Sequence, residues 1–99
     1  MNMIIDTIQK EKRRIEYQLE KYRKVMEELP KGSLLKRDKN GLIYYYMNSR
    51  INGKVVSKYI GKDAGELPSQ IEKRKHTEAM IKLLEEELKI ANKALEGYV

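Results

Sequence analysis

The chain has 99 residues and contains no cysteine, no tryptophan and no phenylalanine. Without cysteine it can form neither a disulfide nor a thiolate metal site. Without Phe and Trp its core has to come from Ile, Leu, Val, Met and Tyr. A chain of this length makes one domain at most, so we expect residues 1–99 to form a single domain.

Long hydrophobic runs are also missing. No apolar stretch approaches the roughly 20 residues that span a bilayer. The start of the chain has no basic residue, and its apolar run stops at Asp6, which does not fit a signal peptide. We therefore expect a cytoplasmic protein with no membrane partner, to which the lack of cysteine is also suited.

The excess of positive charge lies in the middle third of the chain. Residues 30–64 carry eight basic side chains against two acidic ones, whereas residues 1–29 have a net charge of +1 and residues 65–99 of −1. The same middle segment holds four of the seven tyrosines. Basic side chains reach phosphates and tyrosine rings stack on bases, so nucleic acid is the first partner to consider.

The two ends of the chain have the pattern of long amphipathic helices. Residues 1–29 place apolar side chains at alternating spacings of three and four, interrupted only by Lys12, and Pro30 and Gly32 follow the last of them. The second helix is predicted over residues 69–96, starting at Ser69 in a capping box with Glu72. The two seams consist of Ile5, Ile8, Lys12, Ile15, Leu19, Tyr22, Met26 and Leu29, and of Ile81, Leu84, Leu88, Ala91 and Leu95.

The middle segment changes to a strand pattern. Asn40-Gly41 and Asn52-Gly53 are the residue pairs preferred in tight hairpin turns, and they separate three short β-rich runs. The sequence therefore predicts a three-stranded antiparallel meander over residues 33–61.

The second turn sets a register for the last two strands. With Asn52 and Gly53 as the loop residues, Ser49 faces Val56, Tyr46 faces Tyr59 and Tyr45 faces Ile60. One face then holds Ile43, Tyr45, Met47, Val56 and Ile60, and the other holds Tyr44, Tyr46, Asn48, Arg50, Val55, Ser57 and Tyr59. A two- or four-residue first turn adds Leu34 to the apolar face and Leu35 and Arg37 to the tyrosine face, whereas a three-residue turn swaps them.

These elements predict an α+β chain in the order helix, meander, helix, with the two helices paired antiparallel. The helices are longer than the strands, so part of each seam is left over. This remaining part of each seam is buried either by the helix hairpin itself or by a second chain, and we expect a homodimer.

Signals for an enzyme are weak. His76 has no second His or Cys at metal-ligand spacing, and the run Glu85–Glu87 has the pattern of a solvated helix face. Gly61-Lys62 lacks the earlier glycine and the following Ser or Thr of a phosphate-binding loop. We expect no catalytic residue, metal, cofactor or small-molecule substrate.

Around the tyrosines a resemblance appears. It rests on Leu29 to Leu34, on Asn40-Gly41 with Tyr44 to Tyr46, and on Gly53 to Lys62. This stretch resembles a small, uncharacterised bacterial and archaeal domain family in which a Tyr-rich, Gly-Lys-containing hairpin is followed by a charged helix. Its closing part is also similar to hairpins at the N-terminus of DDE-type transposases and, in looks, to the arm-binding domains of tyrosine recombinases. The resemblance implies DNA-related biology by analogy, and no catalytic residue carries over.

The leading expectation is a small, non-enzymatic nucleic-acid-binding protein, with DNA favoured. Tyrosine is also a good strand former, so partial burial of the three rings beneath a helix is the alternative role for Tyr44, Tyr46 and Tyr59. The rival function is a scaffold that oligomerises through its helices. The candidate nucleic-acid-binding residues are Arg37, Tyr44, Tyr46, Asn48, Arg50, Lys54, Lys58, Tyr59 and Lys62.

Overall fold

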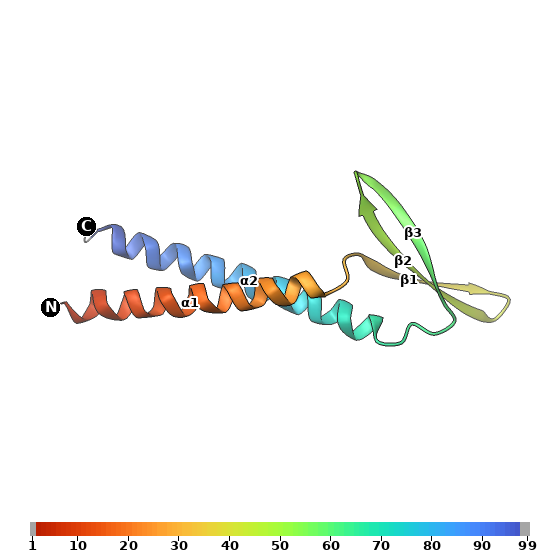
Figure 1. The fold of residues 1–99 in the computed structure, drawn as a ribbon, viewed down its shortest axis with the longest axis horizontal. Coiled ribbons are helices and arrows are strands. Elements are labelled where there is room, and N and C mark those ends of the chain that lie inside the picture. Colours follow the sequence, from red (N-terminus) through yellow and green to blue (C-terminus); the bar gives the residue numbers. More distant parts are fainter. Residues whose placement is uncertain (1, 98–99) are drawn as a thin grey trace. The chain divides into compact units, whose positions relative to one another are not determined.

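The computed structural model describes residues 2–97, and its elements confirm the expected α+β fold class. Along the chain, a three-stranded sheet lies between two long helices (Figure 1). Helix α1 spans Met3–Glu28 and helix α2 spans Leu67–Glu96, close to the predicted 1–29 and 69–96, although Met1 lies outside the described residues. The strands are β1, Ser33–Lys39; β2, Leu42–Ile51; and β3, Lys54–Gly61.

The chain divides into two compact units. The helical unit contains the residues up to Glu28 and those from His76 on, and the sheet unit contains Leu29–Lys75, so the first residues of α2 belong to the sheet unit. The two units also differ in their net charge. The helical unit has ten basic and eleven acidic side chains, and the sheet unit has eleven basic and four acidic ones. Their net charges are therefore −1 and +7, so the excess of positive charge lies in the sheet unit.

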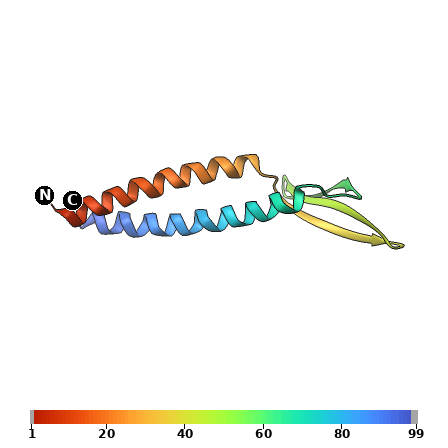
Figure 2. The ribbon, with the colours of Figure 1, turned by 90° about the horizontal axis from the view of Figure 1, so that it is seen from below.

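In the helical unit, α1 and α2 lie side by side and antiparallel (Figure 2). The seams meet as predicted: Ile15, Leu19 and Leu84 form a buried cluster, against which Tyr22, Ile81 and Leu88 pack. Ion pairs join Arg14 to Glu87 at 3.8 Å and Arg23 to Glu85 at 3.5 Å. These pairs are solvent-exposed and contribute little, so apolar burial holds the two helices together.

The helix starts differ from one another in their caps. The Asn2 side-chain oxygen accepts hydrogen bonds from the Ile4 and Ile5 amides, which satisfies two free N–H groups of α1. The predicted capping box at the start of α2 is wrong. The helix begins at Leu67, and the Ser69 hydroxyl donates instead to the Glu66 carbonyl at 2.9 Å.

The sheet is the predicted antiparallel meander, in the order β1-β2-β3. Lys39 pairs with Leu42 and Ile51 with Lys54, so each Asn-Gly pair forms a two-residue turn. All four turn residues have positive φ, from 52° at Asn52 to 82° at Gly41, which is the conformation that an Asn-Gly turn favours. The first turn is thus of the two-residue kind, which places Leu35 and Arg37 on the tyrosine face, opposite Tyr46 and Tyr44.

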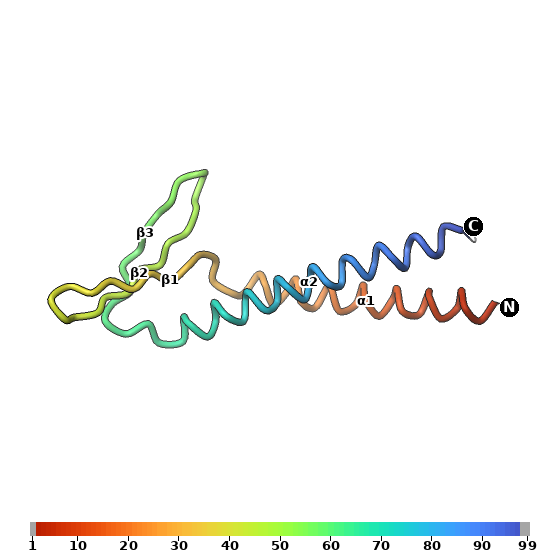
Figure 3. Tube along the Cα trace, turned by 180° about the vertical axis from the view of Figure 1, so that it is seen from behind, coloured from red at the N-terminus to blue at the C-terminus, as the bar shows by residue number. Residues whose placement is uncertain are grey.

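The predicted pairing of Tyr45 with Ile60 is wrong. The register is regular from Ile51–Lys54 to Tyr46–Tyr59, but Tyr45 then pairs with Gly61. One extra residue of β3 is accommodated there as a bulge, and Gly61 has a φ of 136°, which suits glycine. Figure 3 shows the two hairpin turns pointing in different directions, so β2 is strongly curved along its length.

Two further contacts anchor the entry and exit of the sheet unit. Gly32 has a φ of 119°, and a Cβ at this position would lie 2.3 Å from the Asn48 carbonyl oxygen. The backbone before β1 therefore passes directly against β2. Arg74, in the first turns of α2, donates a part-buried hydrogen bond of 3.1 Å to the Leu29 carbonyl.

Candidate nucleic-acid interface

The tyrosine face of the meander is built by strand alternation. Tyr44, Tyr46, Asn48 and Arg50 occupy every second position of β2, so their side chains share one face. The directly paired residues of the neighbouring strands join them there. From β1 come Leu35 and Arg37, and from β3 come Val55, Ser57 and Tyr59.

Three rings form a contiguous cluster on this face. The Tyr46 and Tyr59 centroids lie 5.4 Å apart with planes tilted by 54°, and Tyr44 and Tyr59 lie 6.2 Å apart with a tilt of 47°. Such tilted pairs are favoured by the ring quadrupoles. Tyr44 and Tyr46 are half-buried, and Tyr59, on the edge strand, is 53% exposed. The cluster is therefore neither a closed core nor a set of free rings.

A guanidinium extends this cluster. The Arg37 Cζ atom lies 5.4 Å from the centroid of the Tyr46 ring, within cation–π distance. Arg37 is exposed, so stacking on the ring orients the guanidinium without removing it from solvent. A flat cation beside flat rings offers a phosphate and a base suitable contacts side by side.

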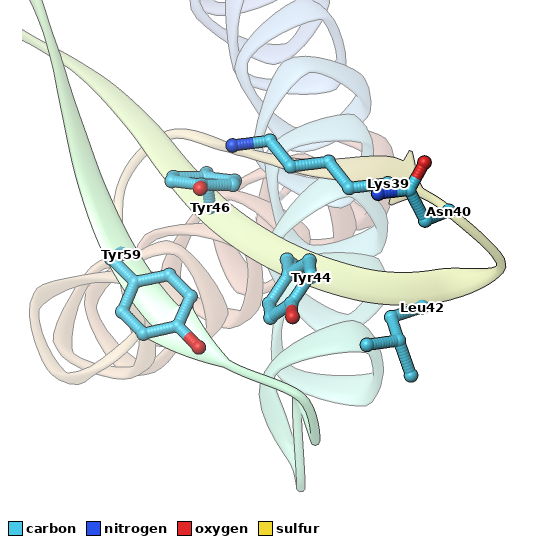
Figure 4. A pocket seen from close by; sticks show the side chains of 6 residues that line it. All are labelled: Lys39, Asn40, Leu42, Tyr44, Tyr46 and Tyr59. Atoms are coloured by element: carbon cyan, nitrogen blue, oxygen red, sulfur yellow. The ribbon is translucent and has the colours of Figure 1, made fainter.

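An open hollow of about 440 Å³ lies over the rings. Tyr44, Tyr46 and Tyr59 line it together with Lys39, Asn40 and Leu42 from the first hairpin turn. Figure 4 shows the Lys39 side chain extending along the strand in the direction of Tyr46. The sequence analysis missed Lys39, although alternation along β1 places it on the same face as Arg37.

Asn48 and Arg50 lie farther along β2, toward the second turn. The Ser57 hydroxyl donates a hydrogen bond to the Asn48 side-chain oxygen across the strands. With its oxygen engaged, Asn48 has its amide N–H groups to offer a ligand. Arg50 is exposed and pairs with Val55, which is 64% exposed, so this end of the hairpin presents its side chains to solvent.

The structure separates two candidate lysines from the tyrosine face. Lys54 pairs with Ile51 and Lys58 with Met47, so both share the opposite face of the sheet with the buried Met47. Lys62 follows the end of β3 and is exposed. The candidate residues thus form one cluster of rings with Arg37, an extension at Asn48 and Arg50, and two lysines on the other face.

Neither a candidate metal cluster nor a membrane-spanning helix is found among the described residues. Within residues 2–97 no group of three or more His, Cys, Asp or Glu side chains could hold a metal ion. Neither described helix is long and apolar enough to cross a membrane.

The family model described as "Domain of unknown function (DUF6788)" matches residues 5–69. The chain belongs to this family. The matched range covers most of α1, the whole meander and the first residues of α2, and it includes every candidate nucleic-acid-binding residue. The expected membership of a small uncharacterised family is thereby confirmed. No curated protein and no solved structure matches the chain.

Proposed function

We propose that this protein is a small, non-enzymatic, cytoplasmic nucleic-acid-binding protein that binds DNA through the tyrosine face of its meander. The observation that carries the proposal is the cluster in which Arg37 lies over Tyr46, which in turn contacts Tyr59. Stacking platforms beside cations are what proteins use to hold the bases and the backbone of nucleic acids.

The charge distribution supports the same proposal. The sheet unit has a net charge of +7, in a chain whose helical unit has −1. A polyanion is therefore attracted to the meander and not to the helix pair. In this proposal Arg37, Arg50 and Lys62 contact phosphates, and Tyr59 offers the most exposed ring.

Lys54 and Lys58 have a different role in this proposal. They lie on the face opposite the rings, so they attract nucleic acid through the field of the whole sheet unit and not through the same contacts. A two-stranded β-ribbon also fits the major groove, where Asn48 and Arg50 are suitable residues for reading base edges. The similarity of the hairpin to those of transposases and recombinases points in the same direction by analogy only.

A scaffold that self-associates through its helices is the second candidate. The specific observation in its favour is that Leu83 and Ile90 of α2 remain 59% and 69% exposed although the predicted seams are largely covered. The two functions are compatible, because they use different units of the chain.

Three matched double charge reversals test the proposal by fluorescence anisotropy with labelled duplex and single-stranded DNA across a salt series. Arg37→Glu with Arg50→Glu alters the tyrosine face, and Lys54→Glu with Lys58→Glu alters the opposite face. Lys82→Glu with Lys89→Glu alters α2 in the helical unit. All three change the net charge by the same amount.

We expect the first pair to weaken binding most and the helix pair least. Losing two phosphate contacts also flattens the slope of log affinity against log salt by about 1.4–1.8, since each contact contributes about 0.7 on single strands and 0.9 on duplex. Tyr59→Ala should lower affinity without changing this slope, because stacking releases no counterions. Equal losses in all three pairs, or no binding at low salt, would refute the proposed site.

A further inference from the structure

One side of the helix pair is more apolar than the other. On one side a groove of about 450 Å³ is lined by apolar side chains of both helices, among them Ile8, Ile15, Ile90, Ala91 and Ala94. On the other side the hollows along α1 are lined mainly by charged residues, including Lys12, Arg13, Glu16 and Arg23. An exposed apolar surface on one side only is a candidate for contact with another protein surface.

The exposed large side chains of α2 lie along the apolar side. Leu83 and Ile90 are seven residues apart, and Ala94 follows Ile90 by four, so all three fall on one line of the helix. Leu83 is 59% and Ile90 69% exposed. On α1, Ile4 is 65% exposed and lies one turn before Ile8, which lines the groove. Burial of this surface would add to the small core of Ile15, Leu19 and Leu84.

We propose that this apolar groove is the docking surface for a second copy of the same chain, which packs its own groove against it in a two-fold, four-helix arrangement. An isologous contact of this kind requires a self-complementary surface, and the groove offers both a projecting and a recessed part. Ile90 projects from it, and the small side chains Ala91 and Ala94 lie beside Ile90 in the same lining. The Ile90 side chain of each copy can therefore fill the space above the alanines of the other.

The charges of the groove fit a second copy and not a nucleic acid. The helical unit has a net charge of −1, so two copies do not repel each other strongly, and a polyanion is not attracted. Arg14 lies in the lining between Glu11, at 2.9 Å, and Glu87, at 3.8 Å. Both signs thus occur on one surface, and a two-fold partner can place its Glu87 near Arg14.

Sedimentation velocity of the full chain between 1 and 200 µM, without nucleic acid, tests this surface with Ile90→Glu as the disrupting variant. Gln9→Glu is the matched control, because it adds the same charge on the charged side of the pair, where Gln9 lines a hollow with Lys12 and Arg13. Far-ultraviolet circular dichroism of each variant reports whether the helices are retained. If Ile90→Glu loses helix, Ile90→Gln replaces it.

We expect the parent chain to approach twice the 11.7 kDa of one copy. Ile90→Glu should raise the dimer dissociation constant by at least about 30-fold, since the two-fold contact loses two buried isoleucines. Gln9→Glu should change it by about twofold at most. A parent chain that stays monomeric, a dimer that Ile90→Glu leaves intact, or equal losses in the two variants would overturn the proposal. None of these outcomes depends on nucleic-acid binding.

Discussion

Comparing alanine substitutions at Gly32 and Gly41 separates the cost of backbone strain from the cost of a steric clash. Its φ of 119° is unfavourable for any residue with a Cβ, and an added Cβ would lie 2.3 Å from the Asn48 carbonyl oxygen and 3.3 Å from the Ser49 Cβ. Gly41 has a φ of 82°, but nothing lies within 4 Å of a Cβ built there. An alanine would be strained at either position, but only at Gly32 would its Cβ also clash with a neighbouring atom.

The expected magnitudes follow from these two terms. Positive φ costs an alanine about 1–2 kcal/mol, which applies at both positions. At Gly32 alone, displacing the β2 backbone from the new methyl group adds about 1–3 kcal/mol to the destabilisation. The Asn48 carbonyl belongs to the backbone and cannot move away as easily as the end of a flexible side chain. Gly32→Ala should therefore destabilise the sheet unit by about 2–5 kcal/mol, and Gly41→Ala by about 1–2 kcal/mol.

Urea unfolding followed by tyrosine fluorescence measures the difference. Four of the seven tyrosines lie in the meander, and the chain has no tryptophan to mask them. Circular dichroism at 222 nm follows the helices in the same samples, so loss of the sheet unit can be distinguished from global unfolding. If the two alanine variants lose the same free energy of unfolding within about 0.5 kcal/mol, the close approach of Gly32 to Asn48 is wrong.

Two other substitutions test contacts of the sheet unit by the same unfolding assay. Gly53→Val should cost about 1–2 kcal/mol, since valine is strained at a φ of 80°, and a variant that melts like the parent would contradict the second turn. Arg74→Ala removes the charged donor of the part-buried bond to the Leu29 carbonyl and should cost about 1–3 kcal/mol. Lys75→Ala, which removes an exposed pair with Glu72, should stay within about 0.5 kcal/mol and serves as its control.

Much of the fold could be predicted because two local signals are strong. Apolar residues at spacings of three and four define the faces of α1 and α2, and Ile15, Leu19 and Leu84 are indeed buried on those faces. Asn40-Gly41 and Asn52-Gly53 predicted both turns, and the second turn also predicted the register of β2 and β3 up to Tyr46 and Tyr59. The sequence left the length of the first turn, and with it the register of β1, open.

The errors and omissions have a local cause at the start of α2 and non-local causes in the sheet. Ser69 and Glu72 fit a capping box, but the turn at Asp63, whose side chain accepts a hydrogen bond from the Gly65 amide, precedes an earlier helix start at Leu67. The bulge opposite Tyr45 adds one residue to β3, and the presence of Gly61 in the sequence is not enough to predict it. The approach of Gly32 to Asn48 joins residues 16 positions apart, so no local pattern reveals it.

The candidate site was predicted in part. Alternation along β2 correctly grouped Tyr44 and Tyr46 with Tyr59, and the structure places the centroid of each of the first two rings within 6.2 Å of the Tyr59 centroid. Lys54 and Lys58 joined the candidates because of their charge, although the same alternation places them on the opposite face. Composition identifies the segment that attracts a polyanion, but only the register tells which cations lie beside the rings.

The two proposals together make a prediction that neither makes alone. A dimer joined through the helical units carries two basic meanders, so a duplex long enough for both should bind more tightly than a short one. It should also show about twice the salt slope, because twice as many phosphates are neutralised. Ile90→Glu should reduce the affinity for long duplex and its salt slope to the values expected for a single meander. It should leave binding to short duplex unchanged. Gln9→Glu, which adds the same charge, should behave like the parent chain on both. If the parent shows equal slopes on long and short duplex while sedimenting as a dimer, the two meanders do not bind one duplex together.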